Sequence, residues 1–138
     1  MRVVADTSTV VSGLMWQGKP RQVLDAARTR TISLFTSIPL LAELEDVLNR
    51  DKFARRLALI GYSPRDLVVG YAALATIVTP AVVSPVVLVD PDDDAVLACA
   101  IAASAQVVVS GDSHLLALKK YQNIPILKAA ELLECIAI

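Results

Sequence analysis

Two apolar runs that end at aspartates constrain the fold of this chain more than any other feature. Residues 3–5, Val-Val-Ala, lead directly into Asp6, and the three valines at 107–109 are followed by Ser-Gly and then Asp112. Short runs of this kind are typical of strands that are buried on both faces of a parallel sheet. Ligands of open parallel sheets bind beyond the carboxyl ends of the strands. If the two strands are neighbours, both carboxylates lie at the same edge of the sheet.

Helical and strand-like segments alternate along the chain, which predicts an α/β fold with a mainly parallel sheet of about five strands flanked by helices. Hydrophobic residues make up 55% of the 138 residues and aromatic residues only 4%, so aliphatic side chains must build the core. No linker or repeat interrupts the pattern, and we expect residues 1–138 to form one domain. The predicted strands are residues 2–5, 31–36, 86–89, 106–110 and 124–127. The predicted helices are residues 7–15, 21–29, a segment after Ser37, and residues 50–60, 64–78, 95–104, 113–120 and 129–136.

Polar residues that accept hydrogen bonds precede several of these helices. Thr7 or Ser8 is the expected N-cap of the first helix, and Ser37 is the expected N-cap of the helix after the second strand. Residues 90–94, Asp-Pro-Asp-Asp-Asp, are expected to form a turn that leads into the helix at residue 95. These helix starts lie next to strand ends, where polar side chains can meet.

Two further acidic groups can reach the same edge of the sheet. The aspartates of residues 90–94 suit either a solvated turn before a helix or a group that faces the crevice. In the helix after Ser37, Glu43 and Glu45 flank the leucine stripe on opposite sides, and Asp46 points away from it. Helical geometry alone does not choose among these three acids, and each of them taken alone is more typical of a solvated surface group than of a ligand. Carboxylates placed close together repel each other unless a cation lies between them, and oxygen ligands suit Mg²⁺ or Mn²⁺.

Four motifs, in this order, resemble those of PIN-domain ribonucleases, which include the VapC-like toxins of bacterial and archaeal toxin–antitoxin pairs. The motifs are residues 3–14 (VVADTSTVVSGL), residues 37–53, residues 90–100 and residues 107–116, and residues 124–127 resemble the last edge strand. Each motif is weak alone, but four in order over nearly the whole chain are a strong signal. The pattern is most similar to a PIN subgroup described as toxin components.

The resemblance implies a three-layer sandwich that hydrolyses RNA phosphodiesters with the help of one or two Mg²⁺ or Mn²⁺ ions. The ligand set that it implies is Asp6, Glu43, Asp93 and Asp112. In this set Glu43 is either a ligand or a general base. Asp94 is the alternative to Asp93 or, if Asp93 is the ligand, a residue that supports the ligands from beside them. Ser8, where many members have Asn, and Ser110 are implied to support the ligands by hydrogen bonds.

The net charge of −1 provides no overall basic field, so RNA must be held by a local patch. Trp16 lies close to the first motif, where it can stack on a base or pack on its own domain. His114, the only histidine, is expected on the surface rather than as a catalytic base. The basic residues near the motifs also suit ordinary solvated helix faces. The candidate RNA-binding residues are Lys19, Arg21, Arg50, Lys52, Arg55 and Arg56.

Two other functions compete with the nuclease. A phosphatase of the haloacid-dehalogenase type would use Asp6 as nucleophile and Asp112 as metal ligand. Its acid/base aspartate is expected two residues after the nucleophile, where this chain has Ser8. A degenerate PIN fold that binds RNA or protein without cleavage is the second alternative. The four filled acidic positions argue against it.

The resemblance also implies protein partners, namely a cognate antitoxin and a second copy of the chain. The apolar excess around residues 67–78 supports a homodimer. Two cysteines without metal-site spacing and the absence of a signal peptide predict a reducing cytoplasm. Residues 67–89 are long and apolar enough to cross a bilayer, but Pro80 and Pro85 interrupt them, and we expect no membrane contact.

Overall fold

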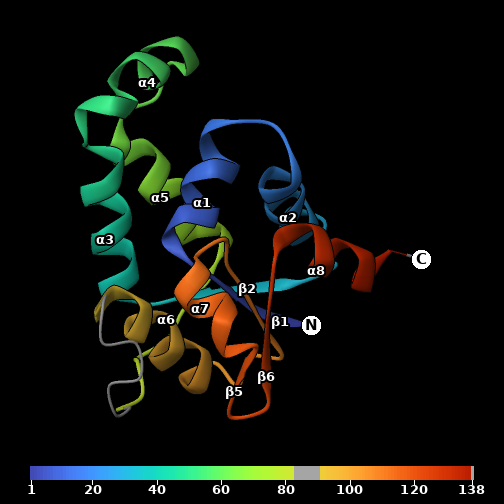
Figure 1. Cartoon of the computed structure of the whole chain (residues 1–138). Helices are drawn as coiled ribbons and strands as arrows, with labels where there is room; N and C mark the ends of the chain where they lie inside the picture. Colours follow the sequence, from blue (N-terminus) through green and yellow to red (C-terminus); the bar gives the residue numbers. More distant parts are fainter. Residues whose placement is uncertain (83–90, 138) are drawn as a thin grey trace.

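The computed structural model of this chain describes residues 1–82 and 91–137, and its centre is a mainly parallel sheet (Figure 1). The strand order is β3-β2-β1-β4-β6-β5, and β5 alone runs antiparallel to its neighbour. The α/β prediction is confirmed, with six strands rather than about five. The strands are β1 (Arg2–Ala5), β2 (Ser33–Thr36), β3 (Thr76–Ile77), β4 (Val107–Val109), β5 (Lys120–Tyr121) and β6 (Ile124–Leu127).

Helices cover both faces of the sheet and make it the middle layer of a three-layer sandwich. The helices are α1 (Thr7–Met15), α2 (Lys19–Arg28), α3 (Ile38–Leu48), α4 (Ala54–Ile60), α5 (Pro64–Leu74), α6 (Pro91–Ala102), α7 (Ser113–Leu118) and α8 (Ala129–Ile136), and the 3₁₀ turn η1 (Asp51–Phe53) precedes α4. Val3 and Val107 pack in the core on the side of α1, α2 and α8. Val4 and Val108 pack in the core on the side of α6 and α7. Successive strand residues face opposite layers, which explains why these strands are apolar throughout.

The two valine-rich strands are direct neighbours in the centre of the sheet. Val3 pairs with Val107 and Ala5 with Val109 in parallel register. The backbone N–H of Asp6 extends the ladder by donating to the carbonyl of Val109 at 3.0 Å. This register brings the residues that follow β1 and β4 to the same edge of the sheet.

The region after α5 differs from the prediction. We expected a helix to about residue 78, but α5 ends at Leu74, and Thr76 and Ile77 pair with β2 as a short edge strand. The β-branched run Thr-Ile-Val-Thr at residues 76–79 suits a strand better than a helix. The strand that we expected at residues 86–89 lies outside the described residues.

One N-cap and several helix boundaries also differ from the prediction: α2 begins at Lys19 rather than at residue 21, and the helix expected over residues 50–60 is divided into η1 and α4. Asp6, not Thr7 or Ser8, is the N-cap of α1, while Ser37 is the N-cap of α3 as expected. Helix α6 begins at residue 91 rather than 95, because a proline is tolerated at the first helical position. Residues 92–94, which we assigned to a turn, therefore lie in the first turn of α6. Helix α7 ends at Leu118, and residues 120 and 121 form the unpredicted strand β5.

Within residues 1–82 and 91–137, no helix is long and apolar enough to cross a membrane. Helix α5, which contains the start of the apolar segment at residues 67–89, is 11 residues long.

Helix α5 starts with a capping box in which Ser63 and Asp66 exchange hydrogen bonds, and these bonds lower the pKa of Asp66.

Candidate metal centre

Four carboxylates from four separate elements line one pocket of about 120 Å³ at the carboxyl end of the sheet. Thr7, Ser8 and Val96 complete its lining. Asp6 follows β1, Glu43 lies on α3, Asp93 lies in the first turn of α6, and Asp112 precedes α7. The pocket thus joins all four acidic positions that the sequence motifs indicated, although they are separated by up to 106 residues along the chain.

Asp6 is held in place by hydrogen bonds from its own helix and from β4. Its Oδ1 accepts from the backbone N–H of Thr9 at 2.9 Å, so the carboxylate caps α1. Its Oδ2 accepts from the Ser110 hydroxyl at 2.5 Å, and the Ser8 hydroxyl lies 3.3 Å from both carboxylate oxygens. The residue is only 4% exposed. A buried carboxylate with this many donors has a defined orientation in the pocket.

Ser110 links the two strand-end aspartates. Its hydroxyl donates to Asp6 and accepts from the backbone N–H of Asp112 at 2.9 Å. Asp112 in turn caps α7, because its Oδ1 accepts from the backbone N–H groups of His114 and Leu115 at 2.8 and 3.2 Å. Helix capping therefore orients both carboxylates, and Ser110 couples them across the sheet.

The remaining two acids come from helices that pack against each other, α3 and α6. On α3, Glu43 is half-buried in the pocket wall, whereas Glu45 forms an ion pair with Arg65 at 3.7 Å and Asp46 is exposed. On α6, Asp93 is 7% exposed and lines the pocket. Its neighbour Asp94 is half-buried and is not among the lining residues.

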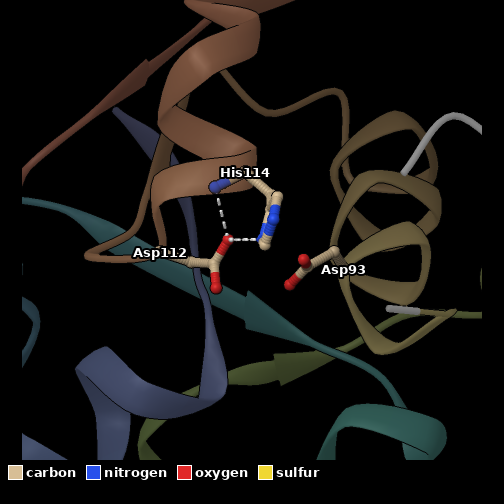
Figure 2. A group of neighbouring side chains, drawn as sticks. All are labelled: Asp93, Asp112 and His114. Carbon is tan, nitrogen blue, oxygen red and sulfur yellow. Dashed lines mark hydrogen bonds and ion pairs between the residues drawn. The ribbon is translucent and has the colours of Figure 1, made fainter. Parts of the chain in front are cut away.

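One further residue lies next to two of these acids: His114 is exposed, as predicted, but it was not expected beside them. His114 lies beside Asp112, with its Nδ1 3.6 Å from Asp112 Oδ1, and Asp93 faces both from α6 (Figure 2). One potential ligand atom from each of these three residues lies within 4.8 Å of the others. The sequence did contain a signal for this position of His114: it lies two residues after Asp112, which caps α7. Both side chains of such a pair project near the start of the helix.

This donor set suits a divalent cation. Clustered carboxylate oxygens are the ligands that Mg²⁺ and Mn²⁺ prefer, and the ligand atoms of Asp93, Asp112 and His114 lie close enough together to be shared by one cation. An imidazole nitrogen adds a donor that favours transition metals over Mg²⁺. The group is thus compatible with metal binding without a large rearrangement.

Comparison with protein families agrees with this architecture. The sequence profile of the PIN domain matches residues 2–114. The chain belongs to the PIN-domain family. No curated protein matches its sequence.

PIN domains are generally metal-dependent nucleases, and the acidic pocket of this PIN domain lies at the expected sheet edge. The predicted membership is therefore confirmed at the level of the family. The match ends at residue 114, so it includes β1, β4 and every residue of the acidic group.

The predicted basic residues of the PIN domain have different surroundings. Arg21 donates to the backbone carbonyls of Gly13 and Leu14 at 2.6 and 3.2 Å, and Arg56 donates to that of Met15 at 2.8 Å. Both guanidinium groups thus provide hydrogen-bond donors for the backbone carbonyls at the C-terminal end of α1, which have no partner within the helix. Lys19 and Arg55 are exposed, and neither lines the acidic pocket. Arg50 and Lys52 are exposed on a second pocket that adjoins the acidic one.

Two buried titratable groups lie in the core of the PIN domain. Burial raises the pKa of the Cys99 thiol from 9.0 to about 11, against a smaller opposing effect of a hydrogen bond with Ser37. Burial, together with the nearby Cys99 and Asp6, also raises the pKa of Tyr71. Within residues 1–82 and 91–137, the Tyr71 hydroxyl has no hydrogen-bond partner. Both groups are held neutral by the fold.

We predict that this burial makes the protein less stable in alkali. The unfolded chain loses the Cys99 and Tyr71 protons near their ordinary pKa values, below the pKa values of the folded state. The free energy of unfolding should therefore fall above about pH 9, by up to about 1.4 kcal/mol per pH unit for each group that has ionised only in the unfolded chain. Urea unfolding at pH 8, 9 and 10 measures the decline. Tyr71→Phe should reduce it at pH 10, and an unchanged decline would contradict the role of Tyr71.

Proposed function

We propose that this PIN domain is a divalent-metal-dependent endoribonuclease that hydrolyses RNA phosphodiester bonds, as the toxin of a VapC-like toxin–antitoxin pair. The observation that carries the proposal is the convergence of Asp6, Glu43, Asp93 and Asp112 on one pocket. Among the described residues no lysine or arginine lines this pocket, so the positive charge that phosphoryl chemistry needs must come from a cation.

Each carboxylate has a role in this proposal. Asp6, Asp93 and Asp112 hold one or two Mg²⁺ or Mn²⁺ ions, and Glu43 is a further ligand or accepts a proton from the attacking water. When bound, the cation lowers the pKa of water, orients the phosphate and neutralises developing charge. Ser110 keeps Asp6 and Asp112 in register through its two hydrogen bonds. Ser8, at the rim, steadies the Asp6 carboxylate.

Incubation of the purified protein with a mixed pool of single-stranded RNA tests the proposal. We expect cleavage in Mn²⁺ or Mg²⁺ and none in EDTA, with activity restored when metal is returned. Hydrolysis of p-nitrophenyl phosphate without RNA cleavage would instead indicate the phosphatase alternative. RNA binding without cleavage, in a preparation freed of any co-purifying protein, would indicate a non-catalytic binding module.

We predict that His114→Gln weakens Mn²⁺ binding about tenfold and leaves Mg²⁺ binding nearly unchanged. An imidazole nitrogen contributes more to a transition metal than to Mg²⁺, which prefers oxygen ligands. Isothermal titration of the chelator-treated protein with each ion measures both affinities. Asp112→Asn is the comparison, because loss of a carboxylate should weaken both ions. Equal effects of His114→Gln on the two ions would exclude a direct nitrogen ligand.

The proposal includes partners. We infer that residues 1–138 act as one domain that forms a homodimer, and that a cognate antitoxin covers the acidic pocket in the resting pair. Leu59 on α4 and Val69 on α5 are 73% and 58% exposed, and such apolar side chains suit an interface. Sedimentation velocity at several protein concentrations measures the dimer. The reading frame next to the gene shows whether an antitoxin is encoded.

A further inference from the structure

A second pocket, of about 300 Å³, opens beside the acidic one and shares part of its wall. Thr7, Ser8 and Glu43 line both pockets, so the two are contiguous. The wall away from the carboxylates is made of apolar, aromatic and basic residues. They are Val11, Trp16, Val47, Arg50, Lys52 and Phe53, with Ser12 among them.

The aromatic side chains of this pocket come from segments that are distant in sequence. Trp16 follows α1 and Phe53 ends η1, and their ring centroids are 6.1 Å apart with planes tilted by 58°. Trp16 is 41% exposed although it is the largest aromatic side chain of the chain, so the fold leaves part of its ring to solvent.

Cations surround this aromatic pair. The Lys52 ammonium lies 5.1 Å from the centre of the Phe53 ring, and the Arg56 guanidinium lies 5.7 Å from the centre of the Trp16 ring. Arg56 also donates to the carbonyl of Met15, which fixes the end of α1 next to Trp16. Arg56 is therefore a positioning residue, while Arg50 and Lys52 remain exposed at the rim.

We propose that this pocket is a nucleotide subsite, in which Trp16, held by its contact with Phe53, stacks on an unpaired base of RNA and Arg50 and Lys52 contact the phosphates of that RNA. The inference rests on the proposed ribonuclease function and names how that site holds its substrate. Base stacking on aromatic rings beside a basic groove is the usual way in which proteins bind single strands. The volume is within the range of pockets for small ligands.

The surroundings select this occupant over a peptide. Glu43 and the acidic pocket repel acidic side chains at one end, and the cations at the rim repel basic ones at the other. A nucleotide meets both conditions, because its base is uncharged and its phosphates can face Arg50 and Lys52 at the rim. Bases in a duplex are stacked and cannot enter, so the subsite selects single-stranded RNA.

The tryptophan makes the test direct, because it is the only one in the chain. Asp112→Asn protein, which should bind without cleaving, is titrated in Mg²⁺ with a single-stranded RNA octamer and with its duplex. We expect saturable quenching of tryptophan fluorescence by the single strand and little by the duplex. Binding of the single strand with unchanged fluorescence would overturn the subsite while leaving the nuclease proposal intact.

Affinity measurements with labelled RNA complete the test. In the Asp112→Asn background, Trp16→Leu should weaken single-strand binding about 5- to 150-fold, the usual effect of losing one stacked base, and Trp16→Phe should retain most of it. Tyr62→Ala, which removes an exposed aromatic ring outside this pocket, is the matched control. Lys52→Gln, which leaves both rings in place, should weaken binding and reduce its salt dependence.

Equal affinities of the Trp16→Leu and control proteins for the single strand would overturn the subsite. Absence of both RNA binding and cleavage in the unaltered protein would overturn the nuclease proposal and this inference with it.

Discussion

Asp112→Asn should abolish metal-dependent RNA cleavage, with a loss of about 100-fold or more. The amide removes the negative charge that holds a cation but keeps the oxygen that accepts hydrogen bonds from His114 and Leu115. Helix α7 therefore remains capped, and the variant should fold. Initial rates of RNA cleavage in Mn²⁺ measure the loss.

The same variant should be more stable than the unaltered protein when metal is absent. Four carboxylates share one pocket, and removal of one charge relieves their mutual repulsion. Added Mn²⁺ should reverse the order, because only the intact site gains the full stabilisation from binding. Thermal unfolding in EDTA and in Mn²⁺ measures both effects. Asp46→Asn, an exposed acid on α3, is the control and should alter neither. Full activity of Asp112→Asn would contradict the assignment of Asp112 as a ligand.

Gly13→Ala should destabilise the fold by about 1–3 kcal/mol, although alanine normally stabilises a helix relative to glycine by about 1 kcal/mol. A Cβ atom at Gly13 would lie 2.9 Å from the backbone carbonyl oxygen of Pro20 and 2.8 Å from Leu24 Cδ1. Leu24 is fully buried and the Pro20 carbonyl belongs to the backbone, so the packing of α1 on α2 must shift to make room. Because Arg21 also binds the Gly13 carbonyl, this shift would disturb the end of α1 next to the pocket.

Gly70→Ala provides the matched control for this prediction. Gly70 lies on α5 and is exposed, and a methyl group added there would meet no atom of the described residues within 4 Å. It should show the ordinary gain of alanine in a helix, up to about 1 kcal/mol. Urea unfolding of both variants gives the comparison. A gain in stability at Gly13 equal to that at Gly70 would show that α1 and α2 can separate without cost.

Much of the fold could be predicted because its signals are local. The strand and helix periodicities gave β1, α1 and β6 with the bounds that the structure has. Ser37 was recognised as an N-cap from residue type and position alone. The errors at β3 and β5 have a common cause. Strands of two residues are too short to show a period, and they exist because a neighbouring strand offers hydrogen bonds.

The candidate site was less predictable from the residues alone. Helical geometry did not choose among Glu43, Glu45 and Asp46, because the choice depends on what faces each side of α3. In the structure α6 and the ends of the strands face Glu43, whereas Arg65 of α5 faces Glu45. Only the family resemblance singled out Glu43 and Asp93 beforehand, and their roles as ligands stay predictions.

The sequence by itself determined the α/β architecture and the position of an aspartate at the end of each central strand, because apolar runs and helix spacing are properties of neighbouring residues. Only the tertiary structure decided that Asp6 and Asp112 share Ser110, that Asp93 lies beside Asp112 and His114, and that Trp16 meets Phe53 beside the same pocket. Apart from those within the Asp112 loop, these contacts join residues 19 to 104 positions apart. They depend on how β1 pairs with β4 and on how α1 and α6 pack on their neighbours. No local pattern encodes such distances, since they follow from the packing of the whole core.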